Sequence, residues 1–165
     1  MIVIIFGPPG SGKGTQSELV SGKYDLHSFE TSKILEAKVR NADQDEYMEI
    51  DGQRFYIRDE KRNWETGLLW SPPVVAQLVI DKIKELHAEG KGIVFSGSPR
   101  TIYEAERVIP VLKDLYGEEA VKILFLHITP EDTIYRNSNR RICKLARHPI
   151  LFNDETKGLK FCPLD

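Results

Sequence analysis

The first residues of the chain have the types and the spacing that bind a polyphosphate. Glycines recur at positions 7, 10, 12 and 14, and Lys13 stands between the last two. Glycines let the backbone curl with its N–H groups pointing inward, and the N-terminus of a following helix adds partial positive charge. The pattern G-x-x-x-x-G-K-[ST] fails by one residue, because Gly14 separates Lys13 from Thr15. We predict a phosphate-binding loop whose ligand contacts come from Gly10, Ser11, Gly12, Lys13, Gly14 and Thr15.

Three arginines further along the chain are candidates to reach the same phosphates. Arg100 follows the apolar run 93–95 and a glycine-proline turn, so it can project over the end of a strand. Arg136 and Arg140 are four residues apart and would share one face of a helix. Phosphoryl transfer needs positive charge around the moving group rather than covalent chemistry by the protein. A solvated surface charge is the alternative for each of these arginines.

The apolar pattern predicts the elements that position these residues. Parallel strands are expected at 2–6, 93–95 and 121–127, with a shorter one at 26–29. Helical patterns lie between them, at 15–21, 32–40, 74–88 and 102–116. This alternation predicts an α/β fold with a parallel sheet covered on both faces, which binds ligands at the carboxyl ends of its strands. The charged stretch 41–70 lacks a strand pattern and is expected to form a small helical insertion.

Composition bounds the class of protein. A chain of 165 residues with 41% hydrophobic residues can bury one substantial core. Its net charge of −2 argues against a nucleic-acid or anionic-membrane partner. The apolar start is too short for a membrane span and lacks the basic flank of a signal peptide. With two cysteines and no disulfide framework, we expect a cytoplasmic protein, acting as a monomer.

Three segments resemble the adenylate kinase and wider nucleoside monophosphate (NMP) kinase family. The loop at 7–15 resembles G-x-P-G-x-G-K-G-T, and 96–101 resembles D-G-F-P-R-T. The segment 136–143 resembles R-x-x-x-R-R-x-C, at the base of the family's ATP lid. The resemblance implies a P-loop NTPase-type core at 1–142, with a helical NMP-binding insertion at about 30–70 and a partial lid at 143–165. We expect the family's C-terminal core elements to be missing from this chain.

The same resemblance implies roles for particular residues. The family transfers a phosphoryl group from Mg-ATP to a nucleoside monophosphate, so ATP and AMP are the expected substrates. The catalytic cations would be Lys13, Arg100, Arg136 and Arg140. The acceptor site would include Thr31, Glu36, Arg100 and Glu104.

Several acceptor-site residues depart from the family pattern. Thr31-Ser32-Lys33 stands where the family has T-G-D, and Glu36 replaces an arginine, which would turn attraction for a phosphate into repulsion. Ser96 replaces an aspartate of the Mg²⁺ shell, and Glu104 replaces a glutamine that reads adenine. The donor side is therefore expected to be intact and the acceptor side altered. Trp64 and Trp70 flank this region and are expected to be buried, with stacking on a base as the alternative.

The lid resembles the family's zinc-type lid. Cys143, His148, Cys162 and Asp165 would form a tetrahedral structural zinc site, with His148 standing in for the ligand lost at Ala146. Two unrelated thiols, or a lid that no longer binds metal, are the alternatives.

Two classes of function remain open. The first is an ATP-dependent NMP kinase, most simply an adenylate kinase, with a kinase for a different monophosphate as its variant. The second is an adenylate-kinase-like protein that binds ATP without turnover, which Glu36, Ser96 and the missing C-terminal elements favour.

Overall fold

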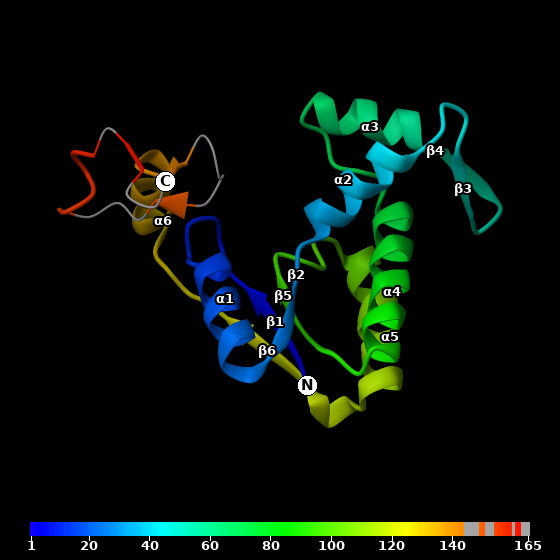
Figure 1. Cartoon of the computed structure of the whole chain (residues 1–165), viewed down its shortest axis with the longest axis horizontal. Coiled ribbons are helices and arrows are strands. Elements are labelled where there is room, and N and C mark those ends of the chain that lie inside the picture. Colours follow the sequence, from blue (N-terminus) through cyan, green and yellow to red (C-terminus); the bar gives the residue numbers. More distant parts are fainter. Residues whose placement is uncertain (144–148, 151–153, 160, 163–165) are drawn as a thin grey trace.

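The computed structural model describes residues 1–143, 149–150, 154–159 and 161–162. Within these residues a four-stranded parallel sheet forms the centre of the fold (Figure 1). Its strands run in the order β2-β5-β1-β6. They are β1 (Ile2–Phe6), β2 (Leu26–Phe29), β5 (Gly92–Ser96) and β6 (Val121–Phe125). The expected strands are confirmed, although β6 ends at Phe125 rather than at residue 127.

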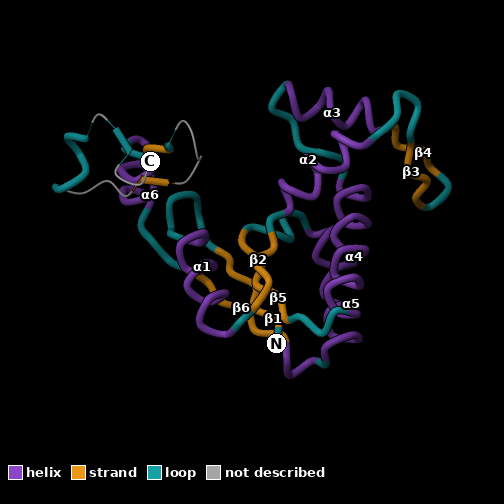
Figure 2. The backbone as a smooth tube through the Cα atoms, viewed as in Figure 1, coloured by secondary structure: helices purple, strands orange, loops and turns teal. Residues whose placement is uncertain are grey.

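Helices cover both faces of the sheet, as the alternating pattern predicted (Figure 2). Alternate residues of β1 face opposite ways: Ile2 and Ile4 belong to one buried cluster, Val3 and Ile5 to another. The first cluster includes residues of α4 and α5, whereas Val20 of α1 packs against the second. This is why β1 is apolar along its whole length. The three helices are α1 (Lys13–Tyr24), α4 (Pro72–Ala88) and α5 (Ile102–Tyr116).

The stretch 41–70 is not purely helical, and this part of the sequence prediction was wrong. A hairpin lies there, whose two strands pair antiparallel around Asp51 and Gly52. Both turn residues have positive φ, 51° and 78°, as a two-residue type I′ turn requires. The insertion lobe consists of α2 (Thr31–Asn41), β3 (Tyr47–Ile50), β4 (Gln53–Tyr56) and α3 (Ile57–Glu65).

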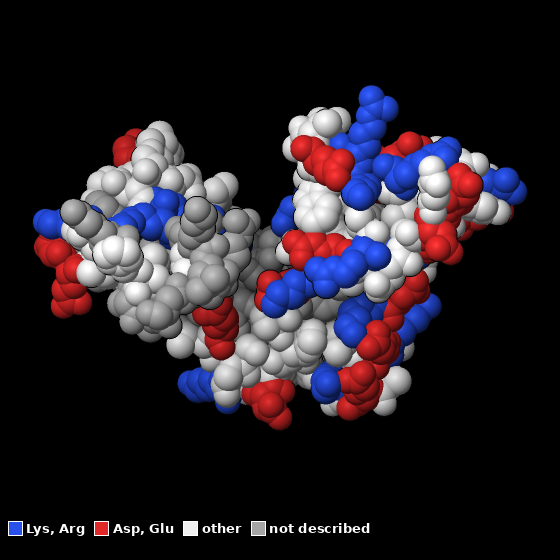
Figure 3. All heavy atoms as spheres, turned by 45° about the horizontal axis from the view of Figure 1, so that its top comes forward, with Lys and Arg blue, Asp and Glu red and all other residues white. Residues whose placement is uncertain are grey.

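A second lobe follows β6 and lies across from the insertion lobe. Its helix α6 (Pro130–Ser138) begins at the cap Thr129, whose side chain accepts a hydrogen bond from the backbone N–H of Asp132. The described part of this C-terminal lobe also contains β7 (Arg141–Ile142) and β8 (Pro149–Ile150). A space-filling view shows a hollow between the two lobes (Figure 3).

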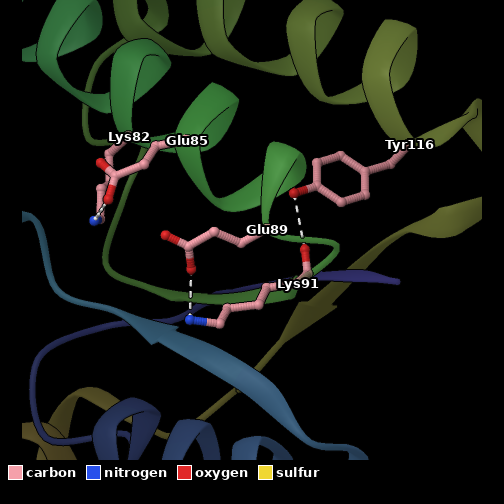
Figure 4. A network of polar contacts seen from close by, with 5 residues as sticks. All are labelled: Lys82, Glu85, Glu89, Lys91 and Tyr116. Carbon is pink, nitrogen blue, oxygen red and sulfur yellow. Dashed lines mark hydrogen bonds and ion pairs between the residues drawn. The ribbon is translucent and has the colours of Figure 1, made fainter.

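The turn between α4 and β5 closes the opposite end of the sheet (Figure 4). Glu89 and Lys91 form an ion pair of 2.5 Å, and the hydroxyl of Tyr116 donates to the carbonyl oxygen of Lys91 at 2.9 Å. Lys82 and Glu85 pair one turn earlier in α4. The Tyr116 hydrogen bond therefore connects the end of α5 to the residue before β5. The short 3₁₀ turn η1 (Glu118–Ala120) follows α5.

The strand β6 is the edge of the sheet beyond β1, and no other described strand pairs with its outer side. Ile123, Leu124 and Phe125 are 57%, 45% and 67% exposed. Apolar residues therefore lie open on both faces of this strand. Among the described residues, no helix is long and apolar enough to cross a membrane.

Candidate active site

The glycine-rich segment forms a tight loop between β1 and α1. Gly10 and Gly12 have φ of 80° and 91°, where side chains with a Cβ are strained. A side chain at Gly10 would also be crowded, since an added Cβ would lie 3.2 Å from Asn137 Nδ2 and 3.3 Å from Arg136 Cβ. The loop closes on itself through a hydrogen bond from Ser11 N–H to the carbonyl oxygen of Pro8.

Lys13 is the first residue of α1, and its side chain folds back across the loop. Its Nζ donates to the carbonyl oxygens of Gly7 and Pro8, at 2.8 and 2.9 Å. Burial, followed by the charges of Arg100 and Arg140, lowers the pKa of Lys13. Three cations from distant parts of the chain therefore converge on the loop, which favours an anionic ligand.

Arg100 follows β5, as the sequence predicted. Its Nε donates to the carbonyl oxygen of Gly97 at 2.9 Å, which holds the guanidinium at the carboxyl end of the strand. The side chain lines a pocket under the insertion lobe, while its charge also acts on Lys13.

The arginines near α6 do not share one helical face. Arg136 lies within the helix, and its Nη1 donates to the carbonyl oxygen of Gly10 at 3.3 Å. The helix ends at Ser138, so Arg140 lies beyond it and the expected common face is wrong. The charge of Arg140 still acts on Lys13. Arg141 instead donates to the carbonyl oxygens of Thr156 and Leu159, inside the C-terminal lobe.

The pocket beside Arg100 has a cavity volume of about 100 Å³. Its apolar wall is formed by Leu35, Trp64, Leu68, Leu69, Trp70, Pro72 and Val75. Its polar lining is Thr31, Ser32, Arg100, Thr101 and Glu104. Arg100 is the one cation among the described lining residues, so a single positive charge faces any anionic group bound there.

Only some of the residues predicted for the acceptor site line this pocket in the described part of the chain. Thr31 and Glu104 line it, whereas the exposed Glu36 does not. Lys33 pairs with Glu30 at 2.7 Å and is also absent from the described lining. Ser96 is the last residue of β5 and is absent from the described pocket lining.

The two tryptophans behave differently. Trp70 is 4% exposed and belongs to the main core, which confirms the expected burial. Trp64 is 38% exposed and lines the pocket, so its burial is incomplete. The loop between them is fixed by the buried Glu60, whose carboxylate accepts the backbone N–H of Ser71 at 2.8 Å. Sequence reasoning missed Glu60, because one glutamate in a charged segment carries no signal of burial.

The predicted zinc ligands fall partly outside the described residues. His148 and Asp165 are outside, whereas Cys143 is buried and Cys162 is partly exposed. Within the described part of the chain, no group of three or more metal-ligating side chains comes together.

A parallel α/β sheet with a glycine-rich loop between its first strand and first helix defines a P-loop nucleotide-binding protein. A family model described as an AAA domain agrees and matches residues 6–144.

Curated relatives narrow this class. An adenylate kinase of Methanothrix thermoacetophila is 30% identical over 93% of this chain and 66% of its own length. An adenylate kinase of Caldicellulosiruptor saccharolyticus is 33% identical over 87% of this chain and 61% of its own length. An adenylate kinase of Mycoplasma mobile is 30% identical over 97% of this chain and 67% of its own length. The chain thus spans about two thirds of the length of the relatives it matches. It belongs to the adenylate kinase family of NMP kinases.

Proposed function

We propose that the chain catalyses ATP-dependent transfer of a phosphoryl group to a nucleoside monophosphate. The bond between the γ-phosphorus and the β–γ bridging oxygen breaks, and a bond forms to a phosphate oxygen of the acceptor. The names of the relatives suggest AMP, with two ADP as products. We place this activity in the cytoplasm and in a monomer.

One observation carries the proposal: Arg100 belongs to both halves of the site. It lines the pocket under the insertion lobe, and its charge acts on Lys13 in the loop. A guanidinium between a donor loop and an acceptor pocket can bind both phosphates and hold them in line.

The loop supports the donor side of the proposal. Its backbone N–H groups and Lys13 would bind the ATP phosphates, which would draw Lys13 Nζ from the carbonyl oxygens of Gly7 and Pro8. Thr15, exposed in the first turn of α1, offers a hydroxyl ligand for Mg²⁺, which neutralises phosphate charge when bound. Arg136 and Arg140 would add charge and help to exclude water.

The test is ADP formation from Mg-ATP with AMP, GMP, CMP and UMP offered separately. We expect turnover with at least one monophosphate, a loss of about 10²-fold or more in Lys13→Ala, and near-native activity in Lys23→Ala. Lys23 is the matched control, since it is exposed at the far end of the same helix.

The alternative is a protein that binds ATP without turnover. It is favoured by the presence of only one cation among the described residues that line the pocket, and by Glu36 on α2. A folded protein that binds ATP through Lys13 but forms no ADP with any monophosphate would establish this alternative and exclude the kinase.

The structural zinc stays a proposal from the sequence. The four ligands would be Cys143, His148, Cys162 and Asp165, and the metal would hold the C-terminal lobe together rather than take part in transfer.

A further inference from the structure

Glu104 is a buried acidic residue in the candidate acceptor site, where a phosphate-bearing ligand would bind. It is 4% exposed and lines the pocket together with Arg100 and Thr101. No described cation pairs with its carboxylate, because the Arg100 guanidinium is bound to Gly97 instead. A buried carboxylate in such a place is stable when its oxygens accept hydrogen bonds.

Each carboxylate oxygen of Glu104 accepts one hydrogen bond from the protein. The backbone N–H of Arg100 donates to Oε2 at 2.9 Å, and the hydroxyl of Thr101 donates to Oε1 at 3.1 Å. A carboxylate has about four lone-pair sites, so about one acceptor position on each oxygen remains. These bonds also fix the carboxylate at the start of α5, where the hydroxyl of the N-cap residue Thr101 in turn accepts the backbone N–H of Glu104.

Two adjacent acceptors match a ligand edge that presents two adjacent donors. The Watson–Crick edge of guanine does so with N1–H and the N2 amino group. Adenine and cytosine place one amino donor beside a ring nitrogen that is itself an acceptor, which a carboxylate repels. Uracil offers one N–H donor between two carbonyl oxygens. The apolar wall of Trp64, Leu68 and Leu69 can pack against the flat face of any base, so it does not distinguish one base from another.

We propose that Glu104 selects a guanine base in the acceptor pocket, so that GMP is preferred over AMP. The inference rests on the proposed function for the location of the acceptor, and it departs from the acceptor that the relatives' names suggest. Bidentate pairing discriminates between bases by roughly 5- to 150-fold.

The test measures binding and turnover separately. Titration of the tryptophan fluorescence gives the affinities of GMP, inosine monophosphate and AMP, and ADP formation gives kcat/KM for each. We expect GMP to bind at least about fivefold more tightly than AMP. Inosine monophosphate, which lacks the N2 amino group, should fall between them.

The variant Glu104→Gln separates base selection from structure. Glutamine keeps one side-chain oxygen as an acceptor but adds a donor, so the GMP preference should collapse or pass to AMP while the melting temperature stays near native. Glu106→Gln, on an exposed position of the same helix, should leave the preference unchanged.

The outcomes separate the two claims. Tighter binding of AMP than GMP, a preference that Glu104→Gln leaves unchanged, or no monophosphate binding at all would overturn the role of Glu104. Binding with the expected preference but no ADP formation would support that role and overturn the proposed kinase.

Discussion

Arg136 Nη1 donates a hydrogen bond to the carbonyl oxygen of Gly10, a residue 126 positions earlier in the chain. The contact joins α6 to the loop at Gly10, where a side chain would be crowded. It holds the base of the C-terminal lobe against the donor site.

Arg136→Ala should therefore reduce activity without unfolding the protein. We expect kcat/KM to fall about 10²-fold, because one cation is lost near the moving phosphoryl group. The free energy of unfolding should change by less than about 0.5 kcal/mol, since the bond is exposed. A coupled assay and urea unfolding measure the two effects, and Arg62→Ala, exposed on α3, is the control. A lower stability with intact kcat/KM would make Arg136 a structural residue.

The indole of Trp70 is packed in the core, but its Nε1–H has no hydrogen-bond partner among the described residues. Trp70→Ala should lower the free energy of unfolding by about 3–5 kcal/mol. Trp70→Phe should cost much less, because it also removes an unpaired donor that costs about 1–3 kcal/mol. Urea unfolding compares the two variants with Trp64→Ala at the exposed indole. Equal losses for phenylalanine and alanine would show that Nε1 is satisfied.

His27 on β2 should make stability depend on pH. Burial, then the charges of Lys82 and Lys91, lowers its pKa below 6.5, against the opposing charges of Glu89 and Glu85. Between the lowered folded value and 6.5, the unfolded chain binds more protons. The free energy of unfolding therefore rises with pH through this window and falls as the solution is acidified.

The variant His27→Asn should flatten that part of the pH profile. Melting temperatures measured from about pH 5 to 8 test this. Identical profiles for wild type and His27→Asn would rule out the contribution of His27.

Removal of metal tests the zinc proposal. If zinc holds the C-terminal lobe, a chelator should lower the melting temperature, because the metal stabilises the folded state. Cys143→Ser should have the lower melting temperature already and should not respond to the chelator. An absence of zinc in elemental analysis, with an unchanged melt, would leave both cysteines without a metal role.

The strands and the loop could be predicted because their signals are local. Apolar runs reproduce β1 and β2 residue for residue, and the glycine spacing locates the loop between β1 and α1. The hairpin β3–β4 was missed although Asp51-Gly52 is a strong two-residue turn signal, since charged neighbours masked the alternation of its strands.

Other parts of the site depend on tertiary structure. The position of Arg140 follows from where α6 ends, at the C-cap Asn139, a residue type that can end a helix but that the R-x-x-x-R spacing left out of account. The contrast between Trp64 and Trp70 follows from packing across the insertion lobe, which spacing alone does not specify. The T-x-x-E pattern of Thr101 and Glu104 is visible in the sequence, but the hydrogen bond from the Arg100 N–H to the Glu104 carboxylate depends on the turn that follows β5.

The open strand β6 also has a practical consequence for work with this protein. Its outer hydrogen-bonding groups and three exposed apolar side chains can template pairing with another chain. A net charge of −2 gives little repulsion between molecules to oppose such contacts. Colloidal stability should therefore fall at high protein concentration, so dilute samples suit measurements on this protein.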